Sequence, residues 1–390
     1  MQANPHQSPS AEPRIPLLVP EMPTADDLLP WLRRIDATRW YSNFGPLCRE
    51  LEGALGDMFA RHNGERPHLT TVSNATLGLE LALTALDLEP GARVLVPALT
   101  FAATATAVVR AGLVPVVTDI DPDSWLLTPA IARQACEALH VDAVLTVATF
   151  GCPHDVGPWD EFTAATGKPV IIDAAGAFGN QWQVGTTTLV FSMHATKSFA
   201  AGEGGMVVSR DAALVARVRQ LSNFGINLDP RATTPIGQVD LPGTNAKLSE
   251  YHAAIGLANL ARWPATAAAR RTLFDRYRAL LEAGVGGFAP VWQRTPAGIT
   301  RTLLCFRVPV VGAREAIEVA CQAANIETRR WYLPLIHQHD GFTELPVAGS
   351  LPVAGAVATD LLGLPFHTRL DEGTLARIVG AVARAAGPAA

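Results

Sequence analysis

The segment Phe191-Ser192-Met193-His194-Ala195-Thr196-Lys197-Ser198-Phe199 follows an apolar run and leads into the turn Gly202-Glu203-Gly204-Gly205. It holds one of only three lysines in a chain whose lysines and arginines together number 31. An arginine guanidinium keeps its proton, whereas a lysine amine can lose it and attack a carbonyl group. Because arginine serves as the cation almost everywhere else, Lys197 is a candidate nucleophile.

A second candidate lies upstream, at the end of the apolar run Val170-Ile171-Ile172-Asp173. A strand-end aspartate by itself is most often a helix cap or turn former, and a single lysine is most often a solvated cation. The two together suit pyridoxal phosphate, because a lysine carries its aldehyde as a Schiff base and a carboxylate keeps its pyridine nitrogen protonated. The sequence therefore predicts a site for this cofactor, with Lys197 and Asp173 as its catalytic residues.

Short β-branched runs alternate with helical patterns from about residue 68, which is typical of a parallel sheet covered by helices. Ligands bind such sheets at the carboxyl ends of the strands, and both Asp173 and Ser192 follow strands. We expect helices at 76–86 and 102–111, and strands at 68–72, 94–97, 114–118, 142–147, 169–172, 187–191 and 205–209.

The expected fold class is α/β, with a large domain whose mostly parallel sheet is sandwiched by helices and a smaller α+β C-terminal domain. Residues 1–30 are rich in proline and polar residues at their start, which predicts an arm that begins extended or disordered. The amphipathic stretch 261–281 predicts a long connecting helix. The large domain should then span 31–262 and the small domain 263–390.

Composition excludes several classes of function. The net charge of −5 and the pI near 6.1 give no basic surface for nucleic acid, and no apolar run is long enough to span a membrane. The cysteines are odd in number and lack both C-x-x-C and metal-ligand spacing, which favours reduced thiols in a cytoplasmic protein without a metal site. They are Cys48, Cys136, Cys152, Cys305 and Cys321.

The cofactor's phosphate and ring need further contacts. The turn Ser73-Asn74-Ala75-Thr76 joins an expected strand to an expected helix, so its backbone N–H groups and hydroxyls can bind an anion, although an ordinary helix cap has the same pattern. Ser192 could add a hydroxyl to the phosphate. Phe101 leaves another strand end and could cover the ring, although core packing explains it equally well.

These motifs, in this order, resemble the DegT/DnrJ/EryC1/StrS family of pyridoxal-phosphate aminotransferases, a sugar-aminating group of fold type I. The resemblance runs from about Ser42 to the C-terminus. Beyond the lysine and aspartate motifs, it rests on the segments Ser42-Asn43-Phe44-Gly45-Pro46-Leu47, 89–97 with Thr100-Phe101, Gly243-Thr244-Asn245-Ala246-Lys247-Leu248-Ser249-Glu250, 329–337 and Leu364-Pro365-Phe366-His367.

The resemblance implies a role for each matching residue. Lys197 would be the Schiff-base lysine, Asp173 the partner of the pyridine nitrogen and Phe101 the stacking ring. The implied phosphate contacts are Ala75, Thr76 and Ser192. In a homodimer with shared active sites, Asn245 and Lys247 would reach the cofactor of the partner subunit, and which of the two contacts the phosphate stays open.

Two positions depart from the family's pattern. Gly176 stands where the family usually has Gln or His near the cofactor's phenolic oxygen, and Ala75 stands where it usually has Gly. The first departure bears on the tuning of the ring and on the substrate class. The form of the motif around Lys197 is closer to members that aminate a sugar at C4 than to those that act at C3.

The implied activity is transfer of the amino group of L-glutamate to a nucleotide-linked keto sugar, expected to be a 4-keto-6-deoxyhexose. His194 is a candidate second acid or base, or a residue that orients substrate or fills space. The alternatives are a sugar dehydratase, in which histidine replaces the lysine, and a non-catalytic cofactor-binding regulator. An aldolase or lyase acting on amino acids would need a carboxylate-binding arginine, for which Arg307, Arg329 and Arg330 are candidates.

Overall fold

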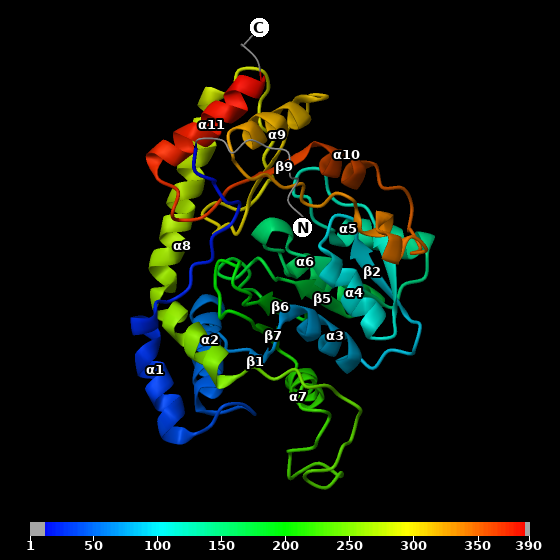
Figure 1. Cartoon of the computed structure of the whole chain (residues 1–390). Helices are drawn as coiled ribbons and strands as arrows, with labels where there is room; N and C mark the ends of the chain where they lie inside the picture. The colour runs from blue at the N-terminus through cyan, green and yellow to red at the C-terminus, as the bar shows by residue number, and fades with distance from the viewer. Residues whose placement is uncertain (1–11, 387–390) are drawn as a thin grey trace.

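A seven-stranded sheet lies at the centre of the molecule, a computed structural model that describes residues 12–386 (Figure 1). Its strand order is β1-β7-β6-β5-β4-β2-β3. Only β7 runs antiparallel to its neighbours β1 and β6, so the predicted mostly parallel sheet is confirmed. The strands are β1 (His68–Val72), β2 (Arg93–Pro97), β3 (Val114–Thr118), β4 (Ala143–Val147), β5 (Val170–Asp173), β6 (Thr188–Ser192) and β7 (Gly205–Ser209).

Helices cover both faces of this sheet because successive strand residues point to opposite sides. In β6, Val190 packs into one buried cluster, while Leu189 and Phe191 pack into another. The first cluster includes residues of α3 (Ala75–Ala85), α4 (Ala102–Arg110) and α7 (Ala212–Leu221). The opposite face is covered by α2 (Pro46–Asn63), α5 (Pro129–Ala138), α6 (Gly157–Thr166) and the start of α8. This three-layer arrangement leaves the carboxyl ends of the parallel strands accessible at one edge.

Helix α8 (Glu250–Gly284) joins the two parts of the chain and runs along one side of the molecule (Figure 1). It is unbroken across residue 262, where we expect the large domain to end, because Pro264 is accommodated within the helix. The division into two domains therefore stays a prediction. The first half of α8 packs on the buried cluster that it shares with α2 and the large sheet. The second half of α8 contributes Phe274, Tyr277 and Leu281 to a separate C-terminal core.

The C-terminal core surrounds a two-stranded antiparallel sheet of β8 (Leu304–Arg307) and β9 (Leu361–Leu364). Helices α9 (Ala313–Ala323) and α11 (Glu372–Ala386) pack on each other beside it. Helix α10 (Pro352–Asp360) instead packs against the large sheet's cluster, which it joins through Ala354 and Val357. Short 3₁₀ turns complete the chain at η1 (Thr149–Gly151), η2 (Ile336–Gln338) and η3 (Asp340–Phe342).

The described part of the N-terminal arm, residues 12–24, is extended and connects both units. Ile15 is buried in the C-terminal core and pairs with Ile326, while α1 (Ala25–Thr38) packs on α8. The expected start of the arm, residues 1–11, lies outside the described residues. Within 12–386, no helix has the length and apolar character needed to cross a bilayer.

Candidate functional site

Asp173 is the last residue of β5 and is buried at the carboxyl edge of the sheet. Its Oδ2 accepts a hydrogen bond from the Thr104 hydroxyl at 2.9 Å, and its Oδ1 accepts one from the Ala175 N–H at 3.1 Å. Burial raises the pKa of this carboxyl, although those two donors and the charge of Lys197 act in the opposite direction. The two hydrogen bonds thus fix the orientation of the carboxylate, and a cationic partner in the cavity would stabilise its charged form.

Lys197 is carried by a loop that follows β6, the strand next to β5. Backbone hydrogen bonds fold this loop back on itself, from Met193 N to Gly204 O and from Ala195 N to Gly202 O, each at 2.8 Å. Gly202 and Gly204 have φ of +83° and +155°, which residues with a side chain rarely adopt. The glycines of this turn therefore shape the loop that presents the lysine.

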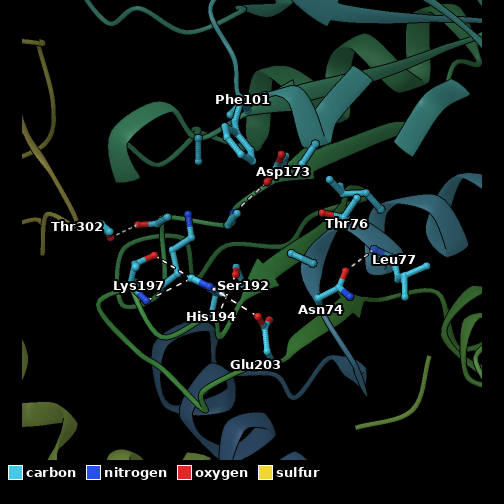
Figure 2. A pocket seen from close by; sticks show the side chains of 18 of the residues that line it. Asn74, Thr76, Leu77, Phe101, Asp173, Ser192, His194, Lys197, Glu203 and Thr302 are labelled. Carbon is cyan, nitrogen blue, oxygen red and sulfur yellow. Dashed lines mark hydrogen bonds and ion pairs between the residues drawn. The ribbon is translucent and has the colours of Figure 1, made fainter. Parts of the chain in front are cut away.

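The amine of Lys197 and the carboxylate of Asp173 face one cavity of about 970 Å³. In Figure 2 the Lys197 side chain points toward the side on which Asp173 and Phe101 lie. Burial lowers the pKa of Lys197, and the negative charge of Asp173 raises it again in part. A lysine with a lowered pKa is deprotonated more readily, as a nucleophile or base must be.

The turn between β1 and α3 lines the same cavity with Ser73, Asn74, Ala75 and Thr76. Asn74 is the N-cap of α3 and accepts a hydrogen bond from Leu77 N at 2.9 Å. The first N–H groups of a helix have no partner within it, and the helix dipole is positive there. This end of the cavity is suited to an anion such as a phosphate.

Gly205 of β7 permits that turn to approach the sheet. A Cβ at this position would lie 2.8 Å from both Ala75 N and the Asn74 carbonyl carbon. Opposite Gly205 in the ladder is Ser192, which is buried and whose Oγ accepts from His194 N at 3.2 Å. Ser192 also lines the cavity, so β6 and β7 bring its hydroxyl to the side of the helix terminus.

Phe101 is the N-cap residue of α4 and is 57% exposed, which is unusual for phenylalanine. Its ring borders the cavity and lies 6.1 Å from the ring of Tyr332. Of the two interpretations offered by the sequence, core packing does not account for this exposure. A ring-stacking role remains a proposal that fits the position.

The segment expected to reach a partner subunit lies beside its own chain's cavity. Ser73 N donates to Ala246 O at 2.7 Å, and Lys247 lines the cavity. Lys247 Nζ donates to Asn245 Oδ1 at 2.8 Å and lies 4.7 Å from the Phe224 ring centroid. Asn245 is not among the lining residues, so within one chain Lys247 borders the cavity and Asn245 does not.

His194 also lines the cavity, at the foot of the lysine loop (Figure 2). Its Nδ1 lies 2.9 Å from the Thr196 hydroxyl, and its Nε2 lies 3.6 Å from a carboxylate oxygen of Glu203. The imidazole is thus held on both sides. This arrangement suits a residue that orients a neighbour as well as one that transfers a proton, and the catalytic role stays a prediction.

Sequence reasoning missed several lining or supporting residues. Thr104 holds Asp173, and it stands in the first turn of the helix that begins next to Phe101, so its nearness in the chain to that predicted site residue could have indicated it. Thr302 and Tyr332 line the cavity from the C-terminal part of the chain, and Leu18 does so from the arm. Tyr332 lies within the quoted segment 329–337, although the resemblance gave it no role at the site. No local pattern marks Thr302 or Leu18, because they come to the cavity only through the packing of distant segments.

None of the described residues that line the cavity is an arginine. An amino-acid aldolase or lyase would need one of three candidate arginines, two of which pair with acidic residues. Arg307 pairs with Asp360, Arg330 pairs with Glu318, and the Arg329 guanidinium stacks 4.9 Å from the Trp331 ring. None of the three candidates lines the cavity of its own chain, although Trp331, which Arg329 contacts, does.

A model of the DegT/DnrJ/EryC1/StrS aminotransferase family matches residues 25–383. This chain belongs to that family. It is 29% identical over 378 residues to the dTDP-4-amino-4,6-dideoxy-D-glucose transaminase of Escherichia coli, covering 93% of this chain and 96% of the relative. The family predicted from the sequence is confirmed.

Two solved structures share the fold. One is a putative PLP-dependent aminotransferase from Bacillus cereus, with a TM-score of 0.87 and 28% identity over 95% of this chain and all of its own. The other is DesI, solved in the presence of its TDP-sugar product, with a TM-score of 0.83 and 30% identity over 96% and 93% of the two chains. The chain is a pyridoxal-phosphate-dependent aminotransferase of fold type I.

The described residues fit that cofactor. The buried Asp173 has its two donors on one side and the cavity on the other, while Lys197 and an anion-binding helix terminus border the same space. These are the three groups that a phosphorylated pyridine aldehyde needs.

Proposed function

We propose that this aminotransferase moves the amino group of L-glutamate to a nucleotide-linked keto sugar, specifically a 4-keto-6-deoxyhexose. The observation that carries the proposal is the meeting of Lys197, Asp173 and the Ser73–Thr76 turn at one cavity. Support for a sugar acceptor comes from the name of the Escherichia coli relative and from the TDP-sugar product of DesI.

Each residue has a distinct task in this proposal. Bound pyridoxal phosphate supplies an electron sink for the carbanion formed when the substrate loses a proton. Asp173 holds the proton on the pyridine nitrogen, which its burial and fixed orientation favour. Lys197 would hold the cofactor's aldehyde, and its amine would move the substrate's α-proton, since burial lowers its pKa.

The remaining contacts bind and orient. Ala75, Thr76 and Ser192 hold the phosphate, Phe101 covers the ring, and His194 is the candidate second acid or base. We propose that the enzyme is a homodimer in which Asn245 and Lys247 complete the partner's site.

A sugar dehydratase is disfavoured because it would have histidine at position 197. A non-catalytic regulator is disfavoured because both proton-handling residues, Lys197 and Asp173, are present.

An assay of purified protein with L-glutamate and dTDP-, UDP- and GDP-linked 4-keto-6-deoxyhexoses tests this function. We expect 2-oxoglutarate and an amino sugar to form in equal amounts, with Lys197→Ala as the inactive control. A 3-keto isomer of the best sugar distinguishes C4 from C3 amination. Turnover with other amino donors but not with glutamate would contradict the donor, and no amine transfer to any keto sugar would contradict the acceptor.

A further inference from the structure

We infer that Thr302 is a positioning residue of the cofactor site and that an ion pair between Glu21 and the buried Arg270 holds it in place. The inference rests on the proposed role of Asp173 at the cofactor ring. It makes the N-terminal arm a structural part of the active site, although the arm and Thr302 lie far apart in the sequence.

The Thr302 hydroxyl donates a hydrogen bond to the carbonyl oxygen of Gly176 at 3.1 Å, across the cavity wall (Figure 2). Thr302 is buried and lines the cavity together with Lys197. Gly176 lies in the short turn that follows Asp173, which the Ala177 N–H closes on Ala174 O at 2.9 Å. Thr302 therefore holds this turn from the C-terminal part of the chain, while Thr104 holds Asp173 from the first turn of α4.

Gly176 itself contributes no side chain, and the space beside it is open. A Cβ at this position would meet only Gly151 N at 3.6 Å and the Thr302 hydroxyl oxygen at 4.0 Å. The hydroxyl of Thr302 is thus the polar side-chain atom nearest to the place where a side chain of residue 176 would begin.

Arg270 of α8 fixes the backbone that carries Thr302. Its Nε donates to Arg301 O and its Nη2 to Thr302 O, both at 3.0 Å, and its guanidinium packs 5.2 Å from the Phe366 ring centroid. The side chain is only 4% exposed. The planar guanidinium of Arg270 therefore fixes the backbone position from which the Thr302 side chain reaches the cavity.

Glu21 of the arm supplies the counter-charge, 2.7 Å from Arg270 Nη1. Asn259 ties the same arm residue to the lysine loop, since its Nδ2 donates to Glu21 O at 3.4 Å and to Ala200 O at 2.7 Å. Removing one partner of a buried pair leaves the other charge uncompensated, and that charge then seeks other contacts. Loss of the Glu21 carboxylate should therefore disturb the two carbonyl contacts of Arg270.

The first experiment compares Thr302→Val, which keeps the shape but loses the hydroxyl, with Thr302→Ser, which keeps the hydroxyl. The readouts on the pyridoxal-phosphate-loaded protein are the cofactor dissociation constant and the pH at which the visible band of the bound cofactor changes. We expect Thr302→Val to bind the cofactor about tenfold more weakly and to move that pH by about half a unit or more, with Thr302→Ser within about twofold of wild type.

The second experiment compares Glu21→Gln with Arg262→Gln. Arg262 makes exposed contacts from the same helix to the arm, with Met22 O and Asp27, so it is the matched control. Glu21→Gln should shift both readouts in the direction of Thr302→Val, and Arg262→Gln should leave them unchanged. In the double variant Glu21→Gln/Thr302→Val, the effect should not exceed that of Thr302→Val by more than about twofold, because both changes act on one contact.

Two results would overturn the inference. One is a Thr302→Val protein that keeps the wild-type dissociation constant and pH midpoint, even if its melting temperature falls. The other is a Glu21→Gln protein that folds and matches Arg262→Gln in both readouts. Since neither donor nor sugar is present, these outcomes are independent of the proposed acceptor, whereas a wild-type protein that binds no cofactor would refute the site itself.

Discussion

The hydroxyl of Thr104 lies 2.9 Å from Oδ2 of Asp173, although the two residues are 69 positions apart in the chain. Thr104 stands in the first turn of α4, which follows β2, and Asp173 ends β5. Because β4 separates these strands in the sheet, the contact spans the edge where the strands end. It turns a buried carboxylate into one with a defined orientation toward the cavity, and the predictions below depend on that orientation.

Asp173→Asn should raise the melting temperature of the cofactor-free protein at pH 7. Burial raises the folded-state pKa of Asp173 above its ordinary value of 3.8, so the folded protein binds this proton more tightly than the unfolded chain. Stability is then fully present below 3.8 and is lost as the pH rises through the folded pKa. An asparagine at this position does not lose stability in this way. The difference in melting temperature between Asp173→Asn and wild type, measured by calorimetry, should therefore shrink toward pH 4.

With cofactor bound, Asp173→Asn should cost stability relative to wild type. Pyridoxal phosphate should raise the melting temperature of wild type more than that of Asp173→Asn, and kcat/KM should fall by about 10²–10³-fold in the variant. Thr104→Val is the milder companion, since it removes only the orienting hydroxyl. Near-normal activity of Asp173→Asn would remove this residue from the site.

Lys197 should be the lysine that forms the covalent bond to the cofactor. Reduction of the loaded protein with borohydride, followed by peptide mass spectrometry, should place the added mass on Lys197. Because its pKa is lowered from 10.5, the rate of attachment should rise with pH and level off below that value. Lys197→Ala should fold normally and turn over no substrate. A modified Lys168 or Lys247 in wild type would contradict this assignment.

Gly205→Ala should impair the phosphate end of the site. The added Cβ would lie 2.8 Å from Ala75 N, and neither backbone can yield easily, so a destabilisation of about 1–3 kcal/mol is expected. Cofactor affinity should fall as well, as measured by equilibrium dialysis. Gly341→Ala is the matched control, because a Cβ there would have no heavy atom within 4 Å. Equal behaviour of the two variants would show that the turn is not held by this contact.

Mixing two inactive variants tests the proposed shared site. If Asn245 and Lys247 act on the partner's cofactor, a dimer of Lys197→Ala with Asn245→Ala/Lys247→Ala contains one intact site and one doubly defective site. Random exchange of equal amounts should then restore about a quarter of the wild-type activity per subunit. No recovery despite demonstrated exchange would assign this segment to its own chain, beside whose cavity Lys247 lies.

The sequence alone determined the family, the sheet and the placement of its ligand edge. Strand positions such as 68–72 and 205–209 could be predicted because β-branched runs and their turns are local patterns. Lys197 and Asp173 could be proposed because a rare lysine and a strand-end carboxylate each stand out within a few residues of sequence. Such signals need no knowledge of what packs against them.

The tertiary structure decided which distant groups complete the cavity. Thr302 reaches Gly176 only because α8 carries Arg270 past the site, and Arg270 can be buried there only because the arm brings Glu21 to it. Likewise, the absence of arginine among the lining residues depends on where Arg307 and Arg330 find their acidic partners. Each of these contacts joins segments that are more than 10 residues apart, so its free energy depends on packing geometry, which no local sequence pattern records.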